Sequence, residues 1–304
     1  MKLYISNFSG LANRLEALVI ASLIADRWGH SIFLHWPEKD SLQVAGTRRA
    51  RIKPWERIGS LKLRDFDEAR LATLGEHRII SLRSTYGPRE RQRNYVLPTA
   101  ARLKAHPQIA AALHDAFARF PGRPAVAVHV RQGDFAVSGD VYDASAHRHP
   151  APGLWWYEHV MREYQRRFPG VYFVVGYSGD PAALERLKAE FDVLTFPGVF
   201  RYNSLLPGHA SAGHPVADLF GLACCSALIA TPTSSFSHWA ANVLGPPAQF
   251  VIPPVRTSRE APGWAVGSLR GGVALDWRDA AERGAGVTVG GALPAPLPPV
   301  TDWL

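Results

Sequence analysis

Apolar and polar positions change in blocks along the chain, and the blocks predict strands that alternate with helices. In the first part, strands are predicted at residues 3–5, 31–36 and 77–82, and helices at 11–28 and 99–120. In the second part, strands are predicted at 125–130, 171–177, 193–196 and 227–230, and helices at 155–168, 182–191, 216–226 and 237–244. Short apolar runs are typical of buried parallel strands, and their alternation with helices builds a parallel sheet. The pattern predicts an α/β fold with a Rossmann-like beginning and a second half that repeats the same order.

Proline and glycine mark the expected domain boundaries. The segment 120–124 (FPGRP) follows a predicted helix, and it indicates a boundary between domains 1–121 and 122–252. The final residues, 253–304, are rich in Gly and Pro and are expected to pack on the core with little regular structure. Residues 41–75 are assigned only as short helices and loops.

The composition is that of a globular protein with an excess of positive charge. Of 304 residues, 47% are apolar, and 34 Lys and Arg stand against 26 Asp and Glu, a formal charge of +8. Anionic partners are therefore expected. The cations are spread along the chain without interleaved aromatics, which disfavours nucleic acid as a partner. The Arg-rich segment 48–51 (RRAR) is compatible with an anionic acceptor, a membrane surface or solvent.

Two adjacent cysteines, Cys224 and Cys225, lie in an apolar stretch, where neighbouring thiols serve as small buried hydrophobes rather than as a disulfide or a metal site. The first residues lead directly into a predicted strand, without the pattern of a secretion signal. No apolar window reaches the length of about 18 residues that a membrane helix needs. A cytoplasmic location is predicted, with peripheral contact to the inner face of the membrane.

Polar side chains follow three predicted strands of the second half, in the segments 129–134 (HVRQGD), 178–180 (SGD) and 231–237 (TPTSSFS). Ligands of open α/β sheets bind at the carboxyl ends of parallel strands, so these segments are expected at one edge. Arg131 offers a forked, permanently charged donor that suits a diphosphate, and Gly133 allows close backbone approach or a positive φ.

The hydroxyl-rich third segment precedes a predicted helix, whose first amides and positive dipole end favour an anion. Thr233, Ser234 and Ser235 would then form a diphosphate cradle with Arg131. Three simpler interpretations stay open: Ser234 or Ser235 is an ordinary helix cap, Arg131 forms a surface salt bridge, and His129 is a hydrogen-bonded core histidine.

Four segments carry a resemblance to a known family: 10–14 (GLANR), 129–134, 177–180 (YSGD), and Asp218-Leu219-Phe220 leading to residues 234–240 (SSFSHWA). In this order they resemble the fucosyltransferase superfamily of α1,2-, α1,6- and protein-O-fucosyltransferases, over residues 1–244. The resemblance implies a GT-B-like fold of two Rossmann-like domains facing a cleft. It also implies GDP-fucose or a related GDP-sugar as donor, with no metal and no other cofactor.

The resemblance also implies roles for individual residues. Arg131 would contact the donor diphosphate, and His129 and Asp218 would lie against the guanosine, with Asp218 accepting from the guanine N1–H and amine. Ser234, Ser235 and Phe236 would line the phosphate side. The residues expected at the donor site are His129, Arg131, Gly133, Ser178, Asp180, Asp218, Thr233, Ser234, Ser235 and Phe236. An alternative role for Asp218 is to cap a helix at 219–226, and Asp180 is a candidate N-cap of the helix at 182–191.

Catalysis needs stabilisation of the departing diphosphate and a base for the acceptor hydroxyl. Arg131 would supply the first, and Asp140 or Asp143 the second, although both aspartates also fit solvated loop positions. Asn13 and Arg14 of the first domain would face the donor or the acceptor. Gln132 and Gly179 depart from residues that are frequent in the family, which leaves acceptor and linkage open.

Rival functions are weaker. Asp65-Phe66-Asp67 has the form of a metal-binding motif, but no buried strand is predicted before it, so a metal-dependent GT-A transferase is disfavoured. The first loop lacks Gly-x-Gly-x-x-Gly, which disfavours a nicotinamide oxidoreductase. The prediction is an inverting, metal-independent transferase that moves fucose to an oligosaccharide or glycolipid. A non-catalytic nucleotide- or glycan-binding protein, or a transferase for a different nucleotide-sugar, is the alternative.

Overall fold

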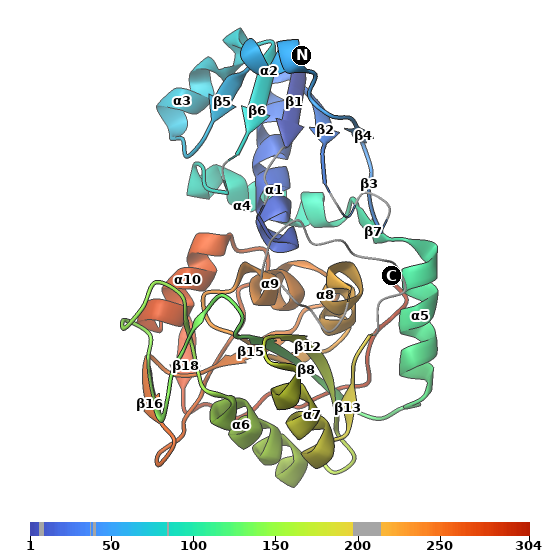
Figure 1. Cartoon of the computed structure of the whole chain (residues 1–304), viewed down its shortest axis with the longest axis vertical. Helices are drawn as coiled ribbons and strands as arrows, with labels where there is room; N and C mark the ends of the chain where they lie inside the picture. Colours follow the sequence, from blue (N-terminus) through green and yellow to red (C-terminus); the bar gives the residue numbers. More distant parts are fainter. Residues whose placement is uncertain (6–8, 37, 39–40, 84, 197–213) are drawn as a thin grey trace. The chain divides into compact units, whose positions relative to one another are not determined.

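The computed structural model describes residues 1–5, 9–36, 38, 41–83, 85–196 and 214–304, which form two compact units (Figure 1). The first, unit 1, contains the described residues up to His106, and the second, unit 2, those from Pro107 onward. Each unit contains its own parallel sheet with helices. The predicted α/β class is confirmed.

Unit 1 is built on a five-stranded sheet in the order β4-β2-β1-β6-β5, with every neighbouring pair parallel. Its strands are β1 (Lys2–Ile5), β2 (Ser31–Leu34), β4 (Thr47–Arg49), β5 (Leu61–Leu63) and β6 (Ile79–Leu82). Its helices are α1 (Leu11–Trp28), α2 (Pro54–Ile58), α3 (Glu68–Thr73) with the 3-10 turn η2 (Leu74–Glu76), and α4 (Arg89–Ala100). A separate antiparallel pair joins β3 (Leu42–Val44) to β7 (Leu103–Ala105).

Helix α1 matches its predicted bounds because the sequence defines both ends. Gly10 precedes it, and Gly29 ends it with a φ of 68°, in the left-handed region that glycine adopts without strain. Most of its side chains are buried, from Leu11 to Ile24, as expected of a helix that is apolar around most of its circumference.

The predicted helix at 99–120 is wrong. Helix α4 ends at Ala100, β7 follows, and α5 begins only at Pro107 and runs to Ala118. Buried Leu103 and Ala105 alternate with exposed Lys104, which is the period of a strand, and His106 precedes a proline that disfavours helical backbone. Residues 41–75 contain three short strands, β3, β4 and β5, besides the predicted helices and loops.

Unit 2 is built on a seven-stranded sheet in the order β13-β12-β8-β14-β15-β17-β18. The strands are β8 (Ala125–Arg131), β12 (Tyr172–Ser178), β13 (Val193–Leu194), β14 (Ala227–Ile229), β15 (Gln249–Ile252), β17 (Ala265–Gly267) and β18 (Val287–Val289). The four pairings among the first five strands of this order are parallel, and the pairings of β17 with β15 and of β18 with β17 are antiparallel. The helices are α5 (Pro107–Ala118), α6 (Leu154–Arg167), α7 (Pro181–Glu190), α8 (Pro215–Ala223), α9 (Ser235–His238) with the π-helical turn η3 (Trp239–Val243), and α10 (Ala274–Arg283). Two small pairs join β9 (Ala136–Val137) to β11 (Pro150–Ala151) and β10 (Val141–Asp143) to β16 (Arg256–Ser258).

Close packing in unit 2 explains one glycine in the middle of a strand. Gly176 of β12 lies beside His129 of β8, and α8 passes directly over it. A side chain at Gly176 would meet Leu222 of α8 at 3.0 Å. Glycine therefore lets α8 approach the sheet next to the strand end that carries His129.

The C-terminal residues contain more regular structure than predicted. They form β16, β17, β18 and α10, and β17 extends the main sheet by pairing with β15. The side chain of Asn242 accepts from the backbone N–H of Leu269 (2.9 Å), and its carbonyl accepts from Gly271 (2.9 Å). The prediction of little regular structure is wrong because the Gly and Pro residues lie largely in connecting turns, while α10 has its own buried stripe around Trp277.

The unit boundary lies before the predicted boundary at residue 121. Helix α5 packs against α8 of unit 2, and the Pro-Gly segment at 120–124 is a turn between α5 and β8. Cys224 and Cys225 are free and buried, as predicted, and burial raises the pKa of both thiols. In the described residues, no helix has both the length and the apolar character that crossing a membrane requires.

Candidate functional site

The three polar strand ends lie side by side at one edge of the unit 2 sheet, as predicted. Strand β8 lies between β12 and β14, and Arg131 is in register with Ser178. The N–H of Gln132 donates to the Ser178 carbonyl at 2.8 Å. After β8 the chain continues to β12, which lies on one side of β8, whereas β14 lies on the other side. The carboxyl end of β8 is therefore a topological switch point, where open α/β sheets bind ligands.

Thr231 ties β14 to the end of β8. Its fully buried hydroxyl donates to the His129 carbonyl at 2.7 Å and accepts from the Arg131 N–H at 3.0 Å. The hydroxyl of Tyr157, on α6, lies 2.9 Å from the same oxygen. The sequence placed Thr231 in the hydroxyl-rich turn but gave it no role, and nothing in the pattern pointed to Tyr157.

His129 is buried and connects β8 to α9. Its Nδ1 lies 2.7 Å from the Ser237 hydroxyl, and its ring stacks on Phe236 with centroids 4.8 Å apart. Burial, together with the nearby charge of Arg131, lowers the pKa of His129 to about 3. The imidazole is therefore neutral near pH 7, in agreement with the core-histidine interpretation, and it does not act as an acid there.

The guanidinium of Arg131 forms a two-point ion pair with Asp134. Nε lies 2.8 Å from Oδ1, and Nη2 lies 2.7 Å from Oδ2. The guanidinium also lies over the ring of Phe135, 5.1 Å from the centroid. The salt-bridge interpretation therefore accounts for two of the three nitrogens, and Nη1 bonds to no described residue. Gly133, between the ion-pair partners, is exposed and does not adopt a positive φ.

The hydroxyl-rich turn carries two buried hydroxyls without partners among the described residues, those of Thr233 and Ser234. Ser234 occupies the N-cap position of α9, but its side chain makes no capping hydrogen bond. Ser235, half-buried, begins the helix. Thr233 has a φ of 57°, the one non-glycine positive value in the described chain. Such backbone is strained for a β-branched residue, and it is found mostly at functional sites.

Asp218 does not cap a helix. Helix α8 begins at Pro215, and its N-cap is His214, whose Nδ1 accepts from the Val216 N–H at 3.2 Å. The alternative interpretation, that Asp218 caps a helix at 219–226, is wrong because that helix starts earlier. Asp218 is a buried residue near the beginning of α8, and this first turn lies toward the carboxyl edge because α8 ends just before β14.

Asp180 is the N-cap of α7, as predicted, with its Oδ1 accepting from the Ala182 N–H at 3.0 Å. It follows Ser178, which ends β12. Both residues border the switch-point edge, although Asp180 is exposed.

The two candidate bases belong to β10 and the residues just before it, and β10 pairs with β16. Asp143 ends β10 and accepts from the hydroxyl (2.6 Å) and the N–H (2.9 Å) of Ser145, which lowers the pKa of this carboxyl. Asp140 is exposed and lies 3.4 Å from Arg259. Neither carboxylate hydrogen bonds to the strand-end residues of the described chain, as the solvated-loop interpretation expects.

Asn13 and Arg14 belong to unit 1. Arg14 is buried and forms an ion pair with Glu38, and it donates to the Ser9 carbonyl. Asn13 is half-buried at the start of α1. Within the described residues, the partners of Arg14 are therefore structural groups of its own unit.

Among the described residues, no group of three or more His, Cys, Asp or Glu side chains is placed to bind a metal ion. Asp67 caps α3, accepting from the Arg70 N–H at 2.8 Å. A strand, β5, does precede Asp65, which corrects the expectation, but β5 is a short edge strand that buries only Leu63.

No family model and no curated protein sequence matches the chain. Solved structures match at the level of the fold. Fucosyltransferase NodZ from Bradyrhizobium matches with a TM-score of 0.51 and 15% identity, over 86% of this chain and 96% of that one. NodZ alpha-1,6-fucosyltransferase co-crystallised with GDP matches with a TM-score of 0.50 and 16% identity, over 84% and 98%. A mutant of Arabidopsis thaliana FUT1 in complex with GDP matches with a TM-score of 0.54 and 14% identity, over 86% and 73%. The chain therefore has the fold of fucosyltransferases, as its sequence motifs imply.

Proposed function

We propose that the chain is a glycosyltransferase that moves fucose, or a related deoxyhexose, from a GDP-sugar to a glycan hydroxyl. The observation that supports the proposal is the pair of buried hydroxyls without described partners, those of Thr233 and Ser234, in the turn after β14, the strand beside the one that ends at Arg131. A diphosphate would satisfy both hydroxyls and a charged donor together. The fold likeness to fucosyltransferases supports the same conclusion.

The reaction would proceed with inversion at the sugar. The acceptor oxygen bonds to C1 of the fucose, the bond from C1 to the β-phosphate oxygen breaks, and GDP leaves with the electron pair. Arg131 and the hydroxyl-rich turn stabilise the charge that develops on the diphosphate, which makes a metal unnecessary. Asp218, near the start of α8, would accept from the guanine N1–H and amine, and His129 and Phe236 would lie beside the guanosine.

The acceptor proton needs a base, and Asp140 and Asp143 remain our candidates. The lowered pKa keeps Asp143 ionised near pH 7 but makes it a weak base. Asn13 and Arg14 would act on the acceptor side. Because Arg14 is buried against Glu38, we assign it a positioning role for the segment after β2.

A nucleotide panel tests the donor. Thermal unfolding with GDP, UDP and CDP should show the largest increase in Tm with GDP, through its binding to the folded state. Arg131→Ala should remove the increase, while Arg123→Ala, which removes an exposed arginine of unit 2 paired to Asp192, should retain it. A larger shift with UDP or CDP would contradict the GDP assignment.

Turnover separates an enzyme from a binding protein. Release of GDP from GDP-fucose, with and without EDTA, should proceed at the same rate if no metal takes part. GDP binding without any release of GDP from GDP-fucose would favour the alternative, a non-catalytic nucleotide-binding protein.

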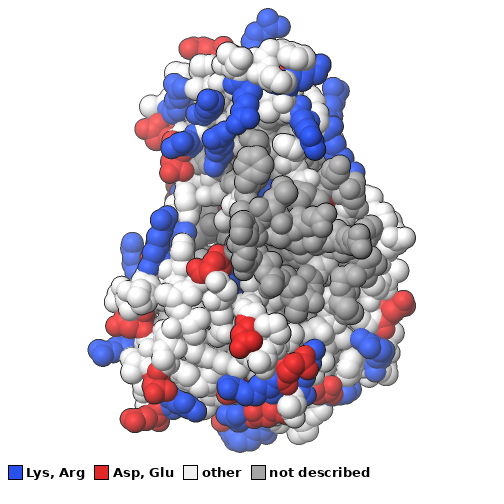
Figure 2. All heavy atoms as spheres, viewed as in Figure 1, with Lys and Arg blue, Asp and Glu red and all other residues white. Residues whose placement is uncertain are grey.

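The surface of unit 1 supports a further partner, an anionic membrane. Trp55 and Ile58, on α2, are 66% and 88% exposed, and Lys53 and Arg57 flank them. Lys and Arg also gather over the face of unit 1 seen in Figure 2. Exposed Trp and Ile among cations are suited to a membrane interface with anionic lipids. We propose peripheral contact through α2, on the inner face of the membrane.

A further inference from the structure

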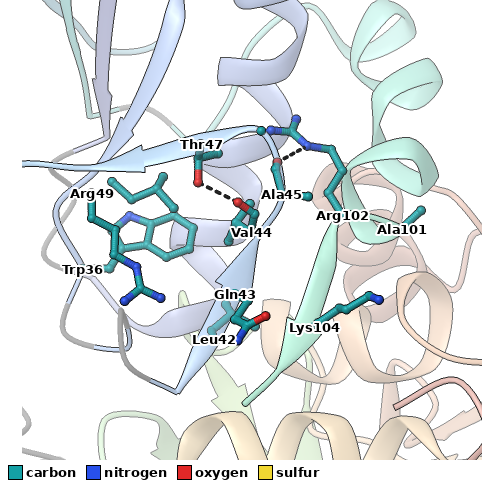
Figure 3. Close-up of a pocket in the computed structure, with 12 residues that line it drawn as sticks. Trp36, Leu42, Gln43, Val44, Ala45, Thr47, Arg49, Ala101, Arg102 and Lys104 are labelled. Atoms are coloured by element: carbon teal, nitrogen blue, oxygen red, sulfur yellow. Dashed lines mark hydrogen bonds between the residues drawn. The ribbon is translucent and has the colours of Figure 1, made fainter. Parts of the chain in front are cut away.

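Unit 1 contains a cavity of about 370 Å³, within the usual size range of ligand pockets (Figure 3). It lies at the carboxyl end of β2 and β4, where Trp36 and Arg49 contribute to its wall. The β3–β7 pair and the end of α4 form the rest, with Arg102 and Lys104. In Figure 3, Trp36 and Arg49 lie on one side and Arg102 and Lys104 on the other.

The charged side chains that line the cavity, among the described residues, are all cations: Arg49, Arg102 and Lys104. Arg102 is half-buried, yet its hydrogen bonds go to neutral oxygens, the Ala45 carbonyl (2.9 Å) and the Ser22 hydroxyl (2.9 Å). No described carboxylate pairs with Arg102 or Lys104. Burial lowers the pKa of Arg102, as expected for a cation without a counter-ion.

The cavity wall also carries a neutral polar side chain. Gln43 stands opposite Lys104 in the β3–β7 pair and contributes an amide to the same cavity. A purely apolar ligand would leave Arg102 and Lys104 without a counter-ion, whereas a hydroxylated ring with an anionic substituent would suit these two cations and the Gln43 amide.

We propose that this cavity binds an anionic saccharide, a sugar with a carboxylate or phosphate substituent, as the acceptor of the transfer reaction. The inference rests on the proposed function, because it names the acceptor class of that enzyme. It also gives a role to the Arg-rich segment 48–51, whose Arg49 lines the cavity.

Binding to the full-length protein tests the cavity without turnover. Ligand-observed NMR titrations compare glucuronate, glucose 6-phosphate, glucose and inorganic phosphate as probes. Glucuronate or glucose 6-phosphate should bind at least about tenfold more tightly than glucose and than inorganic phosphate, because a charged hydrogen bond adds to those of the ring. The stronger of the two identifies the substituent. Equal binding of glucose and both anionic sugars, or inorganic phosphate binding as tightly as glucose 6-phosphate, would overturn the proposal.

Matched variants locate the binding. Lys104→Gln should weaken binding of the preferred probe about tenfold and leave glucose unchanged, whereas Lys104→Arg should retain most of the affinity. Lys62→Gln removes an exposed cation of unit 1 outside the cavity and should have no effect. Ala101→Phe, which adds bulk to an exposed residue of the wall, should block every probe. Equal loss from Lys62→Gln and Lys104→Gln would overturn the proposal.

The GDP thermal shift is measured on the same samples. If wild-type protein binds the anionic sugar but shows no response to GDP, the proposed function fails while the cavity assignment stands as a saccharide site. If GDP raises the Tm and the probes do not bind, the acceptor assignment fails alone.

Discussion

The two units share one architecture but distribute charge differently. Residues 1–106 carry 19 Lys and Arg against 10 Asp and Glu, a formal +9, whereas residues 107–304 carry 15 against 16, a formal −1. In unit 2 many arginines are paired internally, as in Arg162 with Glu190 and Arg186 with Glu158. Unit 2 contains the proposed binding site of an anionic donor, yet it has no net positive charge. A donor site therefore depends on a few fixed groups, while the excess charge of unit 1 is available for other anions.

The sharpest way to test this difference is to remove one cation from each unit. Arg131→Ala should reduce the rate of GDP release from GDP-fucose about a hundredfold, because a charged contact to the departing diphosphate is worth about 3 kcal/mol. Lys62→Gln, in unit 1, should leave this rate unchanged. Arg131→Ala also removes the ion pair with Asp134. Because the Asp134 side chain is 40% exposed, losing this ion pair should lower the free energy of unfolding only slightly. A comparable drop in rate from Lys62→Gln would show that overall charge, rather than a placed guanidinium, drives donor use.

Acid should act on unit 2 through two buried histidines. Burial lowers the pKa of His129 to about 3 and that of His238 to about 4. His238 stays neutral with its Nε2 donating to the Gly272 carbonyl (3.1 Å) and its Nδ1 accepting from Asn242 (3.3 Å). In the unfolded chain both imidazoles take up a proton below about pH 6.5, so unfolding binds protons. The free energy of unfolding therefore decreases as the pH is lowered.

The expected loss is about 3 kcal/mol of unfolding free energy between pH 8 and pH 5.5, about 1.4 kcal/mol for each histidine. Stability is complete above about pH 6.5 and declines steadily until the folded-state pKa values are reached. Denaturant unfolding at several pH values measures this slope. His129→Asn should reduce the slope even though it lowers the stability itself, and an unchanged slope would contradict a neutral buried His129.

The sequence predicted the arrangement of the three polar strand ends because its signals are local. Apolar runs located β8, β12 and β14, and parallel pairing then brings the residues after them to one edge. Helix α1 was predicted to its last residue, because Gly29 ends it with a positive φ. Asp180 was recognised as a cap from its position before a helix.

The remaining features depend on contacts between distant residues. Thr231 bonds to His129 and Arg131 across about a hundred positions of sequence, which no local pattern reveals. Strands β3 and β7 are three residues long, each with a polar or charged residue at its centre, and they pair with each other, so their segments looked like loop and helix. The C-terminal strands β17 and β18 were hidden by glycines that proved to lie in or beside turns.

A third test concerns unit 1 alone. Sedimentation with vesicles of phosphatidylglycerol and phosphatidylcholine should retain the protein, and vesicles of pure phosphatidylcholine should not. The double change Trp55→Ala and Ile58→Ser should weaken binding about tenfold, since each removes apolar area from the interface. Val289→Ser, which changes a 64% exposed apolar residue of unit 2, is the matched control. Equal binding to both vesicle types, or equal loss from the control, would count against a membrane contact of α2.

The smallest expected effect comes from changing Thr233, which should alter stability and ligand binding of unit 2 in opposite directions. Thr233 holds a φ of 57°, which costs a β-branched residue free energy that glycine avoids. Thr233→Gly should therefore stabilise the protein by about 1 kcal/mol in denaturant unfolding, while the loss of its buried hydroxyl weakens GDP binding. Thr233→Ser keeps the hydroxyl and should retain GDP binding. If Thr233→Gly bound GDP as tightly as wild type, the strained backbone of Thr233 would serve packing rather than a phosphate, and the donor site would depend on Arg131 and Ser234.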